Sequence, residues 1–304
     1  MGDVTGMFHI ENAVDAYLKS IKVSRKIPYE RRVMTTSFRA MDDILGGFFP
    51  GKMYLLGARP GVGKTSLVTN IRDYHLMKGK KVVTFLLEMS ATHLIERIIA
   101  GKFGLTIQDV MKLNWLREYH RDGYLEEQIM DYLGTVRQTN WWYYGSSHSH
   151  IDKIIETLTV HVNNDTIDFA DLDHFNLIGV SDDRRQGLEN AINRLANFVT
   201  TTLKFPMIIV VHLNRENEST ADGRPIKLSN LRDTGALEQV ADVVMTMHRP
   251  EMRDLQDPSL AGITEIHVLK NRQGPLGTIR LFFDKEKMTF TDITNPSQNY
   301  LLQI

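Results

Sequence analysis

The sequence of 304 residues contains no cysteine. This absence excludes a disulfide framework, a thiolate nucleophile and a cysteine-based zinc site, and it fits a reducing compartment. No apolar run approaches the length needed to cross a membrane. Residues 1–6 have neither the basic nor the apolar region of a signal peptide, and Gly6 stands where a myristoylation pattern requires Ser or Thr. We therefore expect a cytoplasmic protein with no membrane partner.

An excess of either charge is also missing, because the formal net charge is −1. This balance excludes a surface that is basic all over, but it leaves room for a local basic channel that binds nucleic acid. Hydrophobic residues make up 42% of the chain, so a large core can form. The length suits one large α/β domain, with or without an extension.

The N-terminal region differs in pattern from the rest of the chain. Residues 9–24 predict an amphipathic helix, because apolar side chains recur at helical spacing with charged side chains opposite. The polar stretch from Ser24 to Arg32 predicts a linker. The helix either packs back on its own domain or docks on a neighbouring subunit. We expect residues 1–34 to form this helix and linker, and residues 35–304 to form the main domain.

From residue 51 onward, strand and helix patterns alternate, which predicts an α/β fold with a doubly wound, mostly parallel sheet. The last three expected strands are joined by short turns, which predicts antiparallel strands at the C-terminal end. The expected strands are residues 52–57, 82–87, 139–144, 166–172, 207–212, 241–247, 263–270, 276–283 and 287–291. The expected helices are residues 64–78, 91–103, 118–134, 148–161 and 185–203.

A glycine-rich turn between the first of these strands and the first helix is the most informative motif. Its glycines and its Lys-Thr pair follow the order of a phosphate-binding P-loop, with Ala58 where that pattern has its first glycine. Backbone N–H groups of such a turn bind a polyphosphate together with the positive end of the helix dipole. Lys64 then reaches the β- and γ-phosphates, and the Thr65 hydroxyl is a ligand for Mg²⁺. The expected cofactors are ATP and Mg²⁺, and the expected nucleotide-binding residues are Arg59, Pro60, Gly61, Val62, Gly63, Lys64, Thr65 and Ser66.

A carboxylate follows the second strand, which we expect to lie beside the P-loop strand. This carboxylate, Glu88, is placed at the edge where open α/β sheets bind ligands. From there it could orient and deprotonate the water that attacks the γ-phosphate. The alternative interpretation is a helix cap or a surface acid near Ser90.

The strand at 166–172 predicts a Walker B carboxylate, which holds Mg²⁺ through water. Two frames compete, because this strand can end at Asp171 or at Asp173. Asp173 fits better, because the apolar exit of the strand continues after it. Asp171 would then lie inside a buried strand on the same face as Asp173, and it needs a partner, a proton or a nearby metal ion.

Three later segments carry groups that suit phosphate sensing and DNA binding. A run of five apolar residues ends in His212, which could contact the γ-phosphate. The loop from Arg224 to Gln239 combines arginine, glycine and small polar residues ahead of a helix, which suits phosphodiester binding. Lys270 and Arg272 follow a strand on a rigid turn, from which two cations could reach a phosphate bound to another subunit. Each of these segments alone also fits a structural or solvent-exposed role.

Taken together and in order, these motifs resemble the C-terminal motor domain of DnaB-type replicative helicases, a family of RecA-like hexameric ATPases. The resemblance runs from about Thr36 to Asp292. It rests on segment 58–66, on 87–89 around Glu88, on 213–215, on 231–242 and on the hairpin at 270–277. The pair Asp173-His174 is more similar to phage primase–helicase relatives.

This resemblance implies a RecA-like fold and a ring-forming helicase that hydrolyses ATP with Mg²⁺ and moves 5′→3′ on single-stranded DNA. It implies catalytic roles for Lys64, Glu88 and His212, with His212 as the γ-phosphate sensor. Lys270 and Arg272 would reach the γ-phosphate of the neighbouring subunit. Arg232, Asp233 and Gly235 would contact the single-strand backbone, Thr65 and Asp173 would hold the metal ion, and residues 9–24 would pack on the adjacent subunit.

The partners implied by the resemblance are single-stranded DNA, further copies of the chain in a hexameric ring, and a primase or helicase loader, in a bacterial or phage-infected cell. Two other functions share part of the pattern. A RecA/RadA-like recombination ATPase has the same P-loop and sheet, and a non-motor, ATP-switched loader or scaffold binds DNA without translocating. Duplex unwinding coupled to DNA-stimulated ATP turnover distinguishes the helicase from both.

Overall fold

The computed structural model describes residues 10–24, 33–116, 123–145, 149–180, 184–202, 205–213, 235–252 and 257–293. Its strands are β1 (Met53–Ala58), β2 (Val82–Leu86), β3 (Trp141–Tyr144), β4 (Phe169–Asp173), β5 (Met207–His212), β6 (Val243–His248), β7 (Ile263–Asn271), β8 (Gly277–Asp284) and β9 (Thr289–Asp292). Its α-helices are α1 (Ile10–Ser24), α3 (Arg39–Leu45), α4 (Lys64–Met77), α5 (Ala91–Phe103), α6 (Ile107–Met111), α7 (Tyr124–Arg137), α8 (Ile151–Asn163), α9 (Arg184–Thr202) and α10 (Gly235–Val240).

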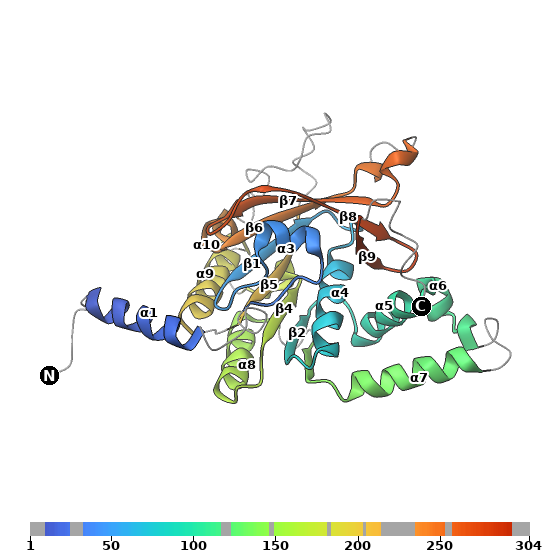
Figure 1. Ribbon diagram of the computed structural model, residues 1–304, viewed down its shortest axis with the longest axis horizontal. Helices are drawn as coiled ribbons and strands as arrows, with labels where there is room; N and C mark the ends of the chain where they lie inside the picture. The colour runs from blue at the N-terminus through green and yellow to red at the C-terminus, as the bar shows by residue number, and fades with distance from the viewer. Residues whose placement is uncertain are drawn as a thin grey trace.

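The described strands form one nine-stranded sheet in the order β3-β2-β4-β5-β1-β6-β7-β8-β9 (Figure 1). Neighbours from β3 to β6 run parallel, and β7, β8 and β9 are antiparallel. This arrangement confirms the predicted doubly wound sheet with antiparallel C-terminal strands. The element bounds differ from the expected ones by a few residues, and the expected helix at 118–134 falls partly outside the described residues.

Two hydrophobic cores cover the two faces of the sheet. Helices α3 and α4 pack on one face, and α8 and α9 pack on the other. The residues of β1, β2 and β4 are all buried, because these parallel strands are covered on both faces. The sequences of β1 and β2 are accordingly almost entirely apolar, whereas β4 carries two buried carboxylates, Asp171 and Asp173, on one face. A third cluster joins α5, α6 and α7 beside this body.

The carboxyl ends of the parallel strands meet at one edge of the sheet. In the strand register, Ala58 pairs with His212 and Leu86 pairs with Asp173. The chain that leaves β2 reaches Glu88 at the same edge. The expectation that β2 lies beside β1 is wrong, because β4 and β5 stand between them. Glu88 still comes close to the P-loop side, since the Leu87 N–H donates to the Asp173 carbonyl at 2.8 Å and fixes the exit of β2 against β4.

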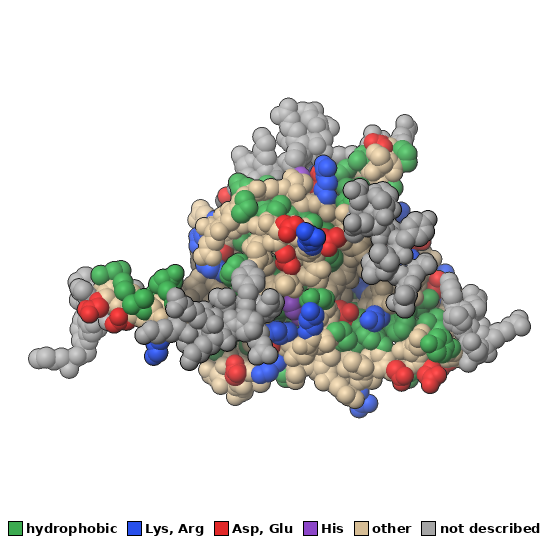
Figure 2. All heavy atoms as spheres, in the orientation of Figure 1, with side chains coloured by type: hydrophobic (Ala, Val, Ile, Leu, Met, Phe, Trp, Pro, Cys, Tyr) green, Lys and Arg blue, Asp and Glu red, His purple; other side chains and the backbone are tan. Residues whose placement is uncertain are grey.

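Helix α1 lies outside the body of sheet and helices (Figure 1). Its apolar side chains Ile10, Val14, Tyr17 and Leu18 are 71%, 49%, 67% and 50% exposed. Figure 2 shows these hydrophobic side chains gathered on the surface of the helix. The helix therefore does not bury this face against the described part of its own chain, which was one of the two predicted options. Among the described helices, none combines the length and hydrophobicity of a membrane-spanning segment.

Candidate nucleotide site

The P-loop follows β1 and leads directly into α4. Gly61 and Gly63 have φ angles of 77° and 113°, which favour glycine at both positions. At Gly63 a Cβ atom would also lie 3.1 Å from the Phe290 ring and 3.2 Å from the Phe283 ring. Ala58 is the last residue of β1, is buried and has no positive φ. The backbone at position 58 therefore does not require the glycine that the P-loop pattern has there.

Lys64, the first residue of α4, is turned toward the loop that precedes it. Its Nζ donates hydrogen bonds to the carbonyl oxygens of Ala58 at 2.8 Å and Arg59 at 3.0 Å. Burial lowers the pKa of the Lys64 ammonium to about 8, although the carboxylates of Asp173 and Glu88 act in the opposite direction. The ammonium is thus held near the mouth of the P-loop by weak neutral acceptors that a phosphate can replace.

Asp173 ends β4, at the position expected for a Walker B carboxylate. The Thr65 hydroxyl donates to Asp173 Oδ2 at 2.6 Å. Asp173 is buried, and its Oδ1 has no hydrogen-bond partner within the described residues. Burial raises the pKa of this carboxyl, and the hydrogen bond from Thr65 acts in the opposite direction. A buried acceptor without a donor fits a Mg²⁺ ion held through water, so the residues present suit the expected metal ion.

Asp171 has a different partner. The Arg72 guanidinium donates to both of its oxygens, at 3.0 and 2.8 Å, and the Thr84 hydroxyl donates at 2.9 Å. Asp171 and Asp173 lie on the same face of β4, as predicted, and they meet residues two turns apart on α4, namely Arg72 and Thr65. Asp171, whose buried carboxylate had no partner that the sequence could identify, therefore forms an ion pair with Arg72 that joins β4 to α4.

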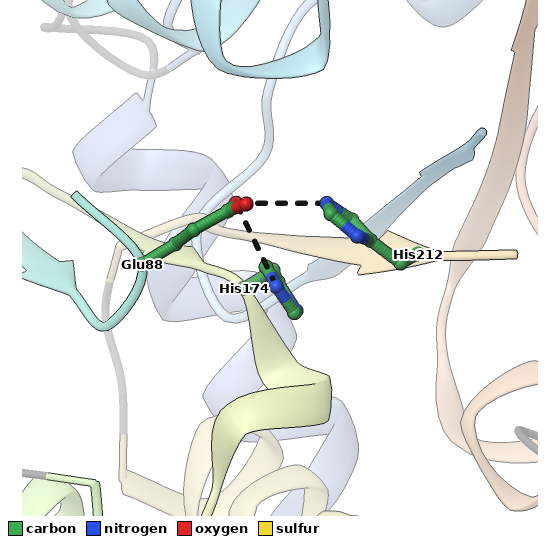
Figure 3. Close-up of side chains that lie close together, drawn as sticks. All are labelled: Glu88, His174 and His212. Atoms are coloured by element: carbon green, nitrogen blue, oxygen red, sulfur yellow. Dashed lines mark ion pairs between the residues drawn. The ribbon is translucent and has the colours of Figure 1, made fainter. Parts of the chain in front are cut away.

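Glu88 faces two imidazoles at the edge of the sheet (Figure 3). Its Oε2 lies 3.6 Å from Nε2 of His174 and 3.6 Å from Nε2 of His212. The two rings stack at a centroid distance of 3.8 Å and an interplanar angle of 18°. Ser90 caps α5 by accepting a hydrogen bond from the His93 N–H. Glu88 is therefore not the cap of this helix, and it points toward the ends of β4 and β5.

The surroundings of both imidazoles favour the neutral ring. Burial and the nearby Lys64 ammonium lower the pKa of His212 to about 4, and burial also lowers the pKa of His174. Two stacked imidazolium rings would repel each other, so this geometry itself requires at least one neutral ring. The Asn176 side-chain oxygen accepts a hydrogen bond from the backbone N–H of His212 at 2.8 Å and fixes the end of β5. The sequence reasoning missed Asn176, although it lies just after the Asp173-His174 pair.

These groups line a cavity of about 740 Å³. Lys64, Thr65 and Glu88 lie on its wall together with His212, and the P-loop glycines form its base. The volume is in the range of small-molecule sites. The lining residues that were not predicted from the sequence include Arg97, Arg249, Phe283 and Met288. Arg249 lies over the Phe283 ring at 5.2 Å from its centroid, and together they form an aromatic and cationic side wall.

Lys270 and Arg272 lie at the opposite edge of the sheet. Asn271 pairs with Val243 at the start of β6, and Val243 pairs with Tyr54 near the start of β1. The P-loop begins four residues beyond Tyr54, about 13 Å farther along the strand. Neither cation is among the described residues that line the nucleotide cavity. The two side chains instead bind the end of α10.

These two cations donate hydrogen bonds to backbone carbonyls, and Nη1 of Arg272 also lies 3.9 Å from Oδ1 of Asp242. Lys270 Nζ donates to the carbonyls of Glu238 at 2.7 Å and Gln239 at 3.0 Å. Arg272 donates to the Gln239 carbonyl at 2.9 Å. Helix α10 begins at Gly235, one of the expected DNA-binding residues, so the hairpin is in direct contact with the end of the segment that we expect to bind DNA. The other two, Arg232 and Asp233, lie outside the described residues.

The fold and the site together define a RecA-like P-loop ATPase. The chain matches the sequence model of the DnaB-like helicase C terminal domain over residues 33–292, and it therefore belongs to this family. It is 30% identical over 290 residues to the replicative DNA helicase DnaB of Buchnera aphidicola subsp. Baizongia pistaciae, in a match that covers 92% of this chain and 60% of that protein. It is 27% identical to the replicative DNA helicase DnaC of Bacillus subtilis, over 85% of this chain and 56% of that protein. The chain thus spans less than two thirds of the length of these relatives.

Solved structures show the same fold. The structure of a DnaB-like replicative helicase, studied with its interactions with primase, matches with a TM-score of 0.79 and 22% identity, over 95% of this chain and 68% of that one. A KaiC-like protein from Pyrococcus horikoshii matches with a TM-score of 0.57 and 15% identity, over 86% of this chain and 99% of that one. At this level of identity the likeness concerns the fold alone.

Proposed function

We propose that this chain is the motor of a ring-forming replicative DNA helicase that uses ATP and Mg²⁺ to move 5′→3′ on single-stranded DNA and to unwind duplex DNA. The observation that carries this proposal is the division of the catalytic groups between two edges of the sheet. The cavity holds the P-loop, Glu88 and His212, whereas Lys270 and Arg272 stand at the far edge. A second copy in head-to-tail contact would bring its cations to this cavity, and repeated contacts of that kind close into a ring.

Nucleotide binding begins with Lys64. In our proposal its ammonium leaves the carbonyls of Ala58 and Arg59 for the β- and γ-phosphates, while the N–H groups of the P-loop surround the phosphate chain. Thr65 and Asp173 would hold Mg²⁺, which neutralises negative charge on the phosphate oxygens. The proposed water-mediated contact between Asp173 and Mg²⁺ is supported by Oδ1 of Asp173, which has no hydrogen-bond partner in the part of the chain that the structure describes.

Hydrolysis then depends on the carboxylate at the end of β2. Glu88, with its side chain 47% exposed toward the cavity, would accept a proton from the attacking water. His212 would donate a hydrogen bond to the γ-phosphate as a neutral ring, because its pKa of about 4 keeps it uncharged. Since β5 leads from His212 into the segment that carries the expected DNA loop, loss of this contact is a route from hydrolysis to DNA movement.

DNA binding would rest on a few backbone contacts. The net charge of −1 does not favour general binding, so Arg232, Asp233 and Gly235 would act as a local site inside a ring. Substitution of Arg232 by Ala should weaken single-strand binding regardless of base sequence and lower the salt slope by roughly 0.7 per contact. Unchanged affinity and slope would exclude this loop as the DNA site.

Further contacts involve the N-terminal helix and additional proteins. The exposed face of α1 would dock on the adjacent subunit, which agrees with its lack of cover on the described part of its own chain. A primase or a helicase loader is a further proposed partner, supported by the structural neighbour that was studied with primase. Such a replicative role belongs in the cytoplasm of a bacterial or phage-infected cell.

The function is tested by joint measurement of ATP turnover and strand displacement. Single-stranded DNA should stimulate ATP hydrolysis by the wild-type protein, and a forked duplex should be unwound only when ATP and Mg²⁺ are present. Lys64→Ala is the matched control and should lack both activities, because productive ATP binding is lost. DNA-stimulated hydrolysis without unwinding would instead favour a RecA/RadA-like ATPase or a non-motor loader.

A further inference from the structure

Three metal-ligating side chains from three different strand ends converge at the edge of the nucleotide cavity. Glu88 follows β2, His174 follows β4 and His212 ends β5, and their side chains point toward one another (Figure 3). One ligand atom from each lies within 4.8 Å of the others. His212 is the last residue of β5, His174 directly follows β4, and Glu88 lies two residues beyond the end of β2, so buried strands anchor the backbone at all three positions.

The two Glu88–histidine distances in this cluster are too long for hydrogen bonds and close to the spacing of ligand atoms around a bound ion. Oε2 of Glu88 lies 3.6 Å from Nε2 of each histidine, which is too long for a direct hydrogen bond. A tetrahedral metal ion with ligands at about 2.0–2.1 Å places its ligand atoms about 3.3–3.4 Å apart. The two Glu88–histidine separations exceed this spacing by only a few tenths of an ångström, and all three ligand atoms lie within 4.8 Å of one another.

The Nε2 atoms of both histidine rings face the same carboxylate, that of Glu88. They stack nearly parallel, and Nε2 of each ring lies 3.6 Å from the Glu88 carboxylate. Because the lone pair of Nε2 lies in the plane of its ring, one ring must turn out of this stack for both nitrogens to bind the same ion. His174 is buried, whereas His212 and Glu88 are 25% and 47% exposed at their side chains. One direction of the cluster is therefore open to the cavity, where water can complete a coordination shell.

We propose that Glu88, His174 and His212 bind one divalent transition-metal ion, of which Zn²⁺ is the best match, in the nucleotide-free protein. Two imidazole nitrogens and one carboxylate oxygen, with a water in the fourth position, are a common zinc ligand set. A neutral imidazole ring has the lone pair that a metal ion needs. Mg²⁺ prefers oxygen ligands, so this site differs from the one at Thr65 and Asp173.

Binding of this ion would inhibit the motor. Glu88 is the proposed base and His212 the proposed γ-phosphate sensor, and a coordinated ion occupies the lone pairs of both. Lys64 and Thr65 are not ligands in this cluster. Zn²⁺ should therefore lower the turnover number rather than prevent nucleotide binding. This inhibitory consequence rests on the proposed function, whereas ion binding itself does not.

Ion binding can be measured without any turnover. The full chain, without a polyhistidine tag, is titrated with Co²⁺ in excess Mg²⁺ and without nucleotide, and the visible absorption of tetrahedral Co²⁺ reports coordination. Displacement by Zn²⁺ in a calorimeter gives the affinity and the stoichiometry. We expect one ion per chain. Glu88→Gln, His174→Asn and His212→Asn should each weaken binding on the order of 100-fold or more, beyond the effect of losing an outer-shell partner.

The matched control is His267→Asn. Nε2 of His267 also lies 3.6 Å from a carboxylate oxygen, that of Glu265, but this pair has no third ligand among the described residues. Its substitution should leave Co²⁺ and Zn²⁺ binding unchanged, and circular dichroism of each variant shows whether the fold is kept. A Co²⁺ spectrum that is absent in the wild-type protein, or that persists in all three folded ligand variants, would overturn the proposal.

The same titrations separate this proposal from the proposed function. A protein with normal DNA-stimulated ATPase but no ion binding lacks the metal site and keeps its motor function. A protein that binds the ion through these three residues but shows no DNA-stimulated ATPase has the metal site and is not the proposed helicase. In the active protein, inhibition by micromolar Zn²⁺ should be reversed by a zinc chelator with Mg²⁺ in excess.

Discussion

Substitution of Asp171 by Asn separates a structural carboxylate from a catalytic one. Arg72 and Asp171 are 1% and 0% exposed and form a bidentate pair. Removal of the negative charge leaves the buried guanidinium without the carboxylate that binds it in bidentate fashion. Loss of one partner of a buried ion pair costs about 3–5 kcal/mol, a large part of the roughly 5–15 kcal/mol that stabilises a typical domain.

The assay is the midpoint of urea unfolding, followed by circular dichroism. Asp171→Asn should lower the midpoint strongly, whereas the double variant Arg72→Met with Asp171→Leu should return it to the wild-type value or above, because no uncompensated charge remains. The double variant also keeps the test valid if the single variant folds poorly. A loss below about 1 kcal/mol in Asp171→Asn would refute the ion-pair reasoning, since that is no more than one ordinary hydrogen bond.

Asp173→Asn should behave in the opposite way. Burial raises the pKa of the Asp173 carboxyl above its value in the unfolded chain. The free energy of unfolding therefore decreases as the pH rises through this pKa, because the buried carboxyl then becomes ionised. The Asn variant should therefore be as stable as the wild-type protein at neutral pH, or more so. Its ATPase should need much more Mg²⁺, and the Mg²⁺ dependence of Asp171→Asn should change less. The reverse order would move the Walker B role to Asp171.

Three further predictions follow from the site and the N-terminal helix. Glu88→Gln should still bind ATP, as measured by calorimetry, but should not hydrolyse it, because only the ability to accept a proton is lost. Hydrolysis near the wild-type rate would show that another group is the base. ATP affinity should be constant below a pH of about 8 and should fall above it by up to about tenfold per pH unit. The reason is that Lys64, with a pKa of about 8, must be protonated to bind phosphate. An ATP affinity that does not change with pH would contradict this coupling. Removal of residues 1–24 should convert rings into folded monomers, measured by light scattering, and should reduce the DNA-stimulated ATPase. The reason is that the apolar face of α1 would contribute several kcal/mol per interface at roughly 25 cal/mol/Å². Rings that keep full ATPase would show that the helix is not a subunit contact.

The sequence predicted the sheet and the P-loop because their signals are local. Continuous apolar runs mark the buried parallel strands, and the pattern around Gly61 and Gly63 requires a backbone that glycine favours. The short helices α3 and α6 were not expected, since Arg39–Leu45 and Ile107–Met111 are too short to show helical periodicity. The order of the strands was also not visible, because it depends on how the crossover helices pack.

The features that could not be predicted from the sequence are contacts between residues that lie far apart in the chain. Arg72 lies 99 residues from Asp171 in the sequence, and no local pattern connects them. The same holds for the stacking of His174 on His212, although the Asp173-His174 pair was noted in the sequence. The cavity residues Arg97 and Arg249 lack a local signal as well, because arginines on helices and after strands are common. Sequence reasoning thus located the residues at strand ends and could not supply their partners.

The division of the active site between two chains is tested most directly by mixing two inactive variants. Arg272→Ala should bind nucleotide at its own P-loop but lose on the order of 10³-fold or more in turnover, and Lys64→Ala should lack productive ATP binding. In a mixed ring, an intact P-loop from the first variant can face an intact Arg272 from the second. We expect the mixture to regain ATPase activity that neither variant has alone. No recovery, in rings shown by native mass spectrometry to contain both chains, would contradict the account.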